Sequence, residues 1–142
     1  ALQLFDGFLH QYIASMQPFS DAAEVLEQCF DCGQLVGIAT NGAASLQTTK
    51  LRTTGLWDDR LIMLAAVEMG AAKPNPEFYT RALDIVGTSP ADTVMVGDSL
   101  PNDVLAPIAA GIAAIHIDHV GTGTADPRYP TIRDLSELLS AP

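Results

Sequence analysis

The chain has 142 residues, of which 48% are hydrophobic and 17% charged, a composition typical of one ordinary domain with a real core. Its formal net charge is −10, from 7 basic and 17 acidic residues, which argues against a nucleic-acid partner because a polyanion needs a basic surface. No apolar stretch approaches the roughly 20 residues of a membrane span, and no basic-then-apolar signal opens the chain. We therefore expect a cytoplasmic protein with neither nucleic acid nor a membrane as partner.

The N-terminal third predicts two helices. Apolar residues recur at helical spacing over residues 2–16, and this helix should end before Pro18. Ser20 or Asp21 could cap a second helix, and Gly33 fits its end. Its two cysteines, in the order Cys-Phe-Asp-Cys, have the spacing of a redox pair. Because no thioredoxin-like strand pattern precedes them, we interpret them as ordinary thiols.

The rest of the chain alternates between strands and helices. Residues 35–39 are short and apolar and predict a buried strand that ends at residues 40–42. The later predictions are a helix over 45–54 closed by Gly55, a strand over 61–64, a helix over 76–86, a strand over 93–96, a helix over 103–110, a strand over 113–117, a loop over 122–128 and a helix over 132–139. This alternation predicts an α/β fold with a Rossmann-like parallel sheet and helices on both faces. In such sheets ligands bind at the carboxyl ends of the strands.

Two polar segments could bind an anion: one follows a predicted strand, and the other precedes a loop stiffened by prolines. Thr40 and Asn41 end the first strand, where a hydroxyl and backbone N–H groups could face an anion, although such a sequence can also be a plain turn. Lys73 is followed by Pro74-Asn75-Pro76, and the two prolines stiffen the backbone after it. A lysine held in this way could bind a phosphoryl group, and the alternative is a solvated loop lysine.

A third segment carries two carboxylates. Asp98 closes the strand over residues 93–96, and Asp103 follows five residues later at the start of a predicted helix. Gly97 between strand and carboxylate permits a close backbone approach. Two converging carboxylates suit Mg²⁺, and a bound cation would also offset the acidic charge of the chain. The alternative is that Asp98 is a turn residue and Asp103 a helix cap.

The order of these three segments resembles the signature of the haloacid dehalogenase superfamily. The resemblance extends from about Pro18 onward and is greatest to phosphatases whose helical cap is inserted early in the chain. It implies that residues 1–17 are a remnant of a helical cap or a return helix. Residues 18–142 would form the α/β core of that family without its first strand.

The resemblance also implies a role for each candidate residue. Thr40 would hydrogen-bond the transferring phosphoryl group, assisted by the backbone amide of Asn41, and Lys73 would stabilise the phosphoryl oxygens and the nucleophile. Asp98 would bind Mg²⁺ directly, and Asp103 would bind it directly or through water. The implied reaction is hydrolysis of a small phosphorylated metabolite through an aspartyl-phosphate.

The nucleophile of the family is missing from the sequence. The family begins with Asp-x-Asp-Gly-Thr on a central strand, and the most similar segment of this chain surrounds Asp6. If Asp6 is aligned with the first aspartate of the motif, Phe8 stands at the second, and if it is aligned with the second, Leu4 stands at the first. The family places that strand between the strands ending at Thr40 and Asp98, so we expect both strands to have unpaired edges. We expect the chain alone to be inactive and a preceding segment to supply the nucleophile. The alternatives are a non-catalytic module that binds phosphate and metal, and a protein whose sheet is completed by a strand from another chain.

Overall fold

A computed structural model describes residues 14–140 of the chain. The helix predicted over residues 2–16 lies outside these residues except at its end, so the cap remnant over residues 1–17 stays a prediction. The elements follow in the order α2 (Ala22–Asp31), β1 (Gly37–Thr40), α3 (Ala44–Thr53), β2 (Ile62–Ala65), α4 (Ala66–Met69), α5 (Pro76–Val86), the 3-10 helix η1 (Pro90–Asp92), β3 (Val94–Gly97), the π-helix η2 (Leu100–Leu105), α6 (Ala106–Ala109), β4 (Ala113–Ile117), β5 (Thr131–Ile132) and the 3-10 helix η3 (Leu135–Leu139). The predicted α/β fold class is confirmed. Over the described residues, no helix has both the length and the apolar character needed to cross a membrane.

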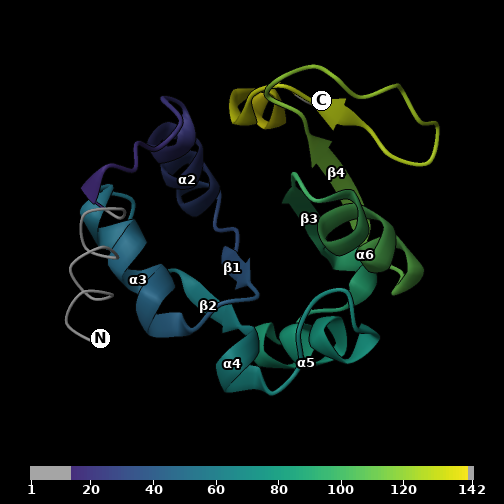
Figure 1. The fold of residues 1–142 in the computed structure, drawn as a ribbon, viewed down its shortest axis with the longest axis horizontal. Helices are drawn as coiled ribbons and strands as arrows, with labels where there is room; N and C mark the ends of the chain where they lie inside the picture. The colour runs from purple at the N-terminus through teal and green to yellow at the C-terminus, as the bar shows by residue number, and fades with distance from the viewer. Residues whose placement is uncertain (1–13, 141–142) are drawn as a thin grey trace, which may run out of the picture.

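The strands form two parallel sheets. β1 pairs with β2, with Gly37 opposite Ile62, and the second sheet has the order β3-β4-β5, with Val94 opposite Ala113. Figure 1 shows the two sheets on opposite sides of the molecule, with α4 and α5 joining them at the base. Within residues 14–140, β1 and β3 each have a partner on one side only, so the predicted unpaired edges are confirmed.

A groove of about 350 Å³ separates the two unpaired edges. Gly37 and Ala39 of β1 line it on one side, and Val94 and Met95 of β3 line it on the other. Side chains of α5, among them Leu83, also line it. The groove therefore combines two strand edges, which can form backbone hydrogen bonds, with apolar side chains, which favour an apolar occupant.

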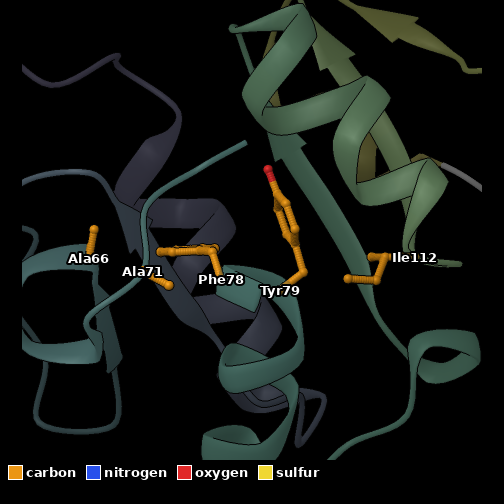
Figure 2. Close-up of a cluster of buried hydrophobic side chains, with 5 residues drawn as sticks. All are labelled: Ala66, Ala71, Phe78, Tyr79 and Ile112. Carbon is orange, nitrogen blue, oxygen red and sulfur yellow. The ribbon is translucent and has the colours of Figure 1, made fainter. Parts of the chain in front are cut away.

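Helix α5 packs the two halves together. Its Phe78 and Tyr79 are 1% and 2% exposed, with ring centroids 5.4 Å apart in an edge-to-face arrangement. Figure 2 shows Phe78 pointing toward Ala71, and Tyr79 lying between Phe78 and Ile112. Burying such a side chain stabilises the fold by about 1.5–3 kcal/mol. The helix that carries both rings is therefore the main link between the sheets.

The bounds of α5 follow from its sequence. Asn75 is the N-cap, and its side-chain oxygen accepts a hydrogen bond of 2.9 Å from the Glu77 N–H. Pro76 occupies the first helical position, where the missing N–H costs nothing. Gly87 ends the helix with φ of 75°, a left-handed conformation that favours glycine. These signals fix the start of the helix only three residues after Lys73.

The helix predicted over residues 103–110 begins earlier than expected. The chain turns into η2 at Leu100, because the Asp103 N–H already donates to the Ser99 carbonyl at 2.7 Å. Helix α6 follows only at Ala106. Asp103 is therefore not the N-cap residue, which is Ser99, but its carboxylate accepts from the Ser99 N–H at the start of η2.

The C-terminal prediction also needs correction. The helix predicted over residues 132–139 starts instead as strand β5, because the N–H groups of His116 and Asp118 donate to carbonyls of Pro130 and Ile132 at 3.0 and 2.8 Å. Only the 3-10 helix η3 remains helical. Pairing with a strand remote in sequence decided this segment, and local spacing could not indicate it.

Candidate functional site

Lys73 joins the carboxyl ends of β1 and β3. Its ammonium donates to the Ala39 carbonyl of β1 at 3.1 Å and to the Asp103 carboxylate, just beyond β3, at 2.6 Å. The Lys73 and Asp103 side chains are each 9% exposed, so the ion pair is largely removed from solvent. The ends of both sheets therefore meet at one place although β1 and β3 do not pair.

The Asp103 carboxylate packs directly on the end of β3. A Cβ atom built on Gly97 would lie closer than 3.0 Å to three atoms of the Asp103 side chain. The second carboxylate oxygen accepts a hydrogen bond of 3.2 Å from the Ser99 N–H. Position 97 therefore needs glycine, since any larger residue would displace this carboxylate.

Thr40 and Asn41 lie at the end of β1, beside the Lys73 contacts. The Thr40 hydroxyl oxygen accepts a hydrogen bond of 3.1 Å from the Gly42 N–H, which leaves its hydrogen free to be donated to a ligand. The Asn41 side chain makes two hydrogen bonds with the main chain of Lys73, at 2.8 and 3.0 Å. The two side chains therefore make different contacts: that of Thr40 is with the Gly42 N–H, and that of Asn41 is with the main chain of Lys73.

Asp98 lies immediately after Gly97 and is exposed. Within residues 14–140 its carboxylate makes no hydrogen bond or ion pair, so it is free to bind a cation. The structure thus brings Asn41, Lys73 and Asp103 into direct contact and places Thr40 and Asp98 next to residues of that contact. Of the residues predicted for the site, none lies elsewhere in the molecule.

The carboxylates fit magnesium in number and chemistry. Mg²⁺ usually takes one or two protein carboxylates and completes its shell with water and substrate phosphate. Asp98 is exposed, and Asp103 lies against the glycine that precedes it. In the described part of the chain no three residues of the types that bind metals gather at one place.

Two contacts near the site were not predicted. The Tyr79 hydroxyl donates to the Asn102 carbonyl at 2.5 Å, and burial followed by the Asp103 charge raises the pKa of Tyr79 to about 12. Tyr79 therefore stays a donor at neutral pH and holds the segment between the two aspartates. The Glu68 carboxylate accepts from the Ala44 N–H at the start of α3 at 3.0 Å. Neither partner could be identified from spacing, because each contact joins distant segments.

The two cysteines lie away from this site, in and just after α2. Both are free, and burial followed by the neighbouring Cys32 raises the pKa of Cys29. A raised pKa reduces the thiolate fraction, whereas reactive thiols have lowered values. Their interpretation as ordinary thiols is consistent with this.

Comparisons with known proteins show the family to which this chain is similar. The family model described as haloacid dehalogenase-like hydrolase matches residues 3–117. A ribulose-1,5-bisphosphate 5-phosphatase of Halopiger xanaduensis is 32% identical over 118 residues, 83% of this chain and 49% of that protein. A phosphoserine phosphatase of Thermus thermophilus is 32% identical over 126 residues, 87% of this chain and 50% of that protein.

Among solved structures, an HAD phosphatase of Thermococcus onnurineus superposes with a TM-score of 0.85 at 31% identity, over 96% of this chain and 63% of that one. The chain therefore spans about half the length of the two curated relatives and under two thirds of this structure. The family model spans residues 3–117, a range that contains Thr40, Lys73 and Asp103.

Proposed function

This chain belongs to the haloacid dehalogenase-like hydrolase family, and from that premise we propose that it supplies the phosphate- and metal-binding residues of a phosphomonoester hydrolase. The observation that carries the proposal is the Lys73 ammonium, which contacts the Ala39 carbonyl and the Asp103 carboxylate at the junction of two strand ends. A buried ion pair costs desolvation energy, so its presence at a polar rim is better explained by function than by stability.

Two side chains would bind the phosphoryl group. The Thr40 hydroxyl, whose oxygen already accepts from Gly42, would donate its hydrogen to a phosphoryl oxygen. The Lys73 ammonium would donate to a second oxygen and would also orient the attacking carboxylate. Donors fixed in this way need no reorganisation as negative charge develops, which is how electrostatic stabilisation accelerates phosphoryl transfer.

Asp98 and Asp103 would hold Mg²⁺. The ion would neutralise charge on the phosphoryl oxygens. Asp103 would serve two purposes, since its other contact holds the Lys73 ammonium. The acidic balance of the chain makes a bound cation favourable at this rim.

The nucleophile would come from a strand in the groove between β1 and β3. The 142 residues contain no Asp-x-Asp pair, and among residues 14–140 the groove has an unpaired strand edge on each side. A strand there would end beside Thr40 and Asp98. Its terminal carboxylate would then lie within reach of the Lys73 ammonium.

The substrate class would be a small phosphorylated metabolite. The relatives are named for different compounds, among them phosphoserine and ribulose-1,5-bisphosphate, and both names describe phosphatases. What they have in common is hydrolysis of a phosphate group. We therefore extend the reaction to this chain and leave the rest of the substrate open.

The groove also favours a second candidate function. Its two unpaired edges could take a strand from another chain, which would make this chain one piece of a strand-exchanged assembly. Alternatively, the phosphate and metal residues could form a binding module without turnover. Light scattering distinguishes the strand-exchanged assembly from the binding module, because strand exchange requires a stoichiometric complex with another chain.

A phosphatase assay tests the leading proposal. The complete protein that contains this chain should hydrolyse p-nitrophenyl phosphate with Mg²⁺ and should lose activity in EDTA. Asp98→Asn should lower kcat by about a hundredfold, because it removes a metal ligand. Asp31→Asn, an exposed carboxylate on α2, is the matched control and should have little effect. Equal activity in Asp98→Asn and Asp31→Asn would overturn the proposal, and binding without turnover would favour the module.

A further inference from the structure

The side chain of Asn41 pairs with Lys73 as a backbone peptide group would. Its amide oxygen accepts from the Lys73 N–H at 2.8 Å, and its NH₂ group donates to the Lys73 carbonyl at 3.0 Å. Both hydrogen bonds go to one residue, which lies 32 positions further along the chain. This reciprocal pattern is the one that two residues exchange in an antiparallel strand pair.

The main chain of Lys73 has little other support. It lies in the loop between α4, which ends at Met69, and α5, which begins at Pro76. A nearby backbone contact within that loop is the donation from the Asn75 N–H to the Ala72 carbonyl at 2.9 Å. That contact does not involve Lys73. Because loop residues without backbone hydrogen bonds exchange between conformations, the position of Lys73 depends on a partner outside the loop.

Lys73 is held at both ends by residues 39–41, at the end of β1 and just after it. Asn41 holds its main chain, and the Ala39 carbonyl accepts from its ammonium at 3.1 Å. The lysine side chain therefore runs alongside the end of β1, past the position of Thr40. Its ammonium then meets the Asp103 carboxylate at 2.6 Å.

We propose that Asn41 is a positioning residue that holds the main chain of Lys73 so that the lysine ammonium stays at the junction of the two sheets. The catalytic consequence of this placement rests on the proposed function, whereas the placement itself does not. Asparagine suits the position because its short side chain carries an acceptor oxygen and a donor NH₂ on separate atoms, as a peptide group does. Aspartate would keep the acceptor, lose the donor and add a negative charge where phosphate would bind.

Amide hydrogen exchange of the chain tests the placement. Asn41→Ala removes both hydrogen bonds and should raise exchange of the Lys73 amide about tenfold. Asn41→Asp keeps the acceptor, so the same amide should stay near the wild-type rate. Asn75→Ala is the matched control in the same loop, and it should expose the Glu77 amide but not that of Lys73. Unchanged Lys73 exchange in Asn41→Ala, or an equal rise in Asn75→Ala, would overturn the proposal.

Amine labelling gives an independent measurement, because the chain has only two lysines. Lys50 on α3 is partly exposed, whereas the Lys73 side chain is 9% exposed. Acetylation followed by mass spectrometry should show Lys73 modified about tenfold faster in Asn41→Ala, with Lys50 unchanged as the internal reference. A purely general loosening of the fold would raise both rates together and would contradict the specific role.

Kinetics of the complete protein connect the placement to catalysis. Asn41→Ala should lower kcat by about tenfold and change KM by much less, because the lysine acts on the developing charge. If the wild type has no phosphatase activity, the proposed function fails while the exchange and labelling results still decide the placement. A change confined to KM would contradict a role through Lys73.

Discussion

Strands β1 and β3 are joined at their carboxyl ends but are separated along the rest of their length. At the carboxyl ends, Lys73 joins them through the Ala39 carbonyl and the Asp103 carboxylate. Below that junction the same strands are separated by a groove of about 350 Å³ with apolar lining, and neither edge is paired there in the described residues. A polar junction is thus assembled without a continuous sheet beneath it. The comparison shows that the loop before α5, rather than strand pairing, sets the geometry of the candidate site.

The largest expected effect comes from breaking the junction. Lys73→Ala would leave the Asp103 carboxylate buried without its cationic partner and should lower the free energy of unfolding by about 3 kcal/mol. Lys50→Ala removes the other lysine and should change it by less than about 0.5 kcal/mol. Urea unfolding of both variants measures the difference. Similar values for the two would contradict the expectation that the buried Asp103 carboxylate needs its cationic partner.

A second change attacks the junction from β3. Gly97→Ala places a methyl group where the Asp103 side chain lies, and should cost about 2 kcal/mol through overpacking. Gly42→Ala is the matched control on the β1 side, because its Cβ would meet only the Thr40 hydroxyl at an ordinary 3.5 Å. Thermal unfolding compares them. If Gly97→Ala were as stable as Gly42→Ala, the packing of Asp103 on the strand end would be contradicted.

A third change tests the hydrogen bond of the Tyr79 hydroxyl separately from the packing of its buried ring. Tyr79→Phe keeps the buried ring but leaves the Asn102 carbonyl without its donor, which should cost about 1 kcal/mol. Asp84→Asn, on an exposed position of α5, serves as the control and should be neutral. Urea unfolding gives both values. An effect above about 3 kcal/mol would indicate that the ring, and not the hydroxyl, had been disturbed.

The smallest expected effect concerns stability in acid, and two ion pairs near the surface should show it. Hydrogen bonds from Arg60 and Arg128 lower the pKa of Asp58 and Asp126 to about 2 from an ordinary 3.8. Because the folded values are depressed, the stabilisation is present above pH 3.8 and is lost as the pH falls through about 2. Asp58→Asn and Asp126→Asn should each weaken this acid dependence slightly in urea unfolding followed over that range. A variant with stronger acid dependence than the wild type would contradict the sign.

Much of the fold could be predicted because, in several elements, the residues that mark the ends in the sequence also mark them in the structure. The bounds of α5 match the prediction over residues 76–86, since Asn75, Pro76 and Gly87 mark both ends. β4 also matches the prediction over residues 113–117. β5 was missed because only its partner β4, remote in sequence, makes it a strand. The early start of η2 was missed because the backbone bond from Asp103 to Ser99 leaves no compositional trace.

The sequence could predict that the candidate residues lie near one another, but it could not predict their contacts. Polar residues that follow strands of a parallel sheet meet at one edge, and this rule predicted that Thr40, Asn41 and Asp98 would lie together. It did not indicate that Asn41 would hold the main chain of Lys73, because a side chain's partner 32 residues away is not encoded in spacing. The pairing of Lys73 with Asp103 likewise depends on where the loop before α5 is placed.

Amide chemical shifts on titration with Mg²⁺ and inorganic phosphate test the central claim most directly. The account predicts that Mg²⁺ perturbs residues 97–103, and that phosphate added afterwards perturbs residues 40–42 and Lys73. Asp98→Asn should remove the first set of changes and weaken the second. Perturbations confined to other parts of the molecule, or a phosphate response that is indifferent to Mg²⁺ and to Asp98→Asn, would contradict a shared metal and phosphate site.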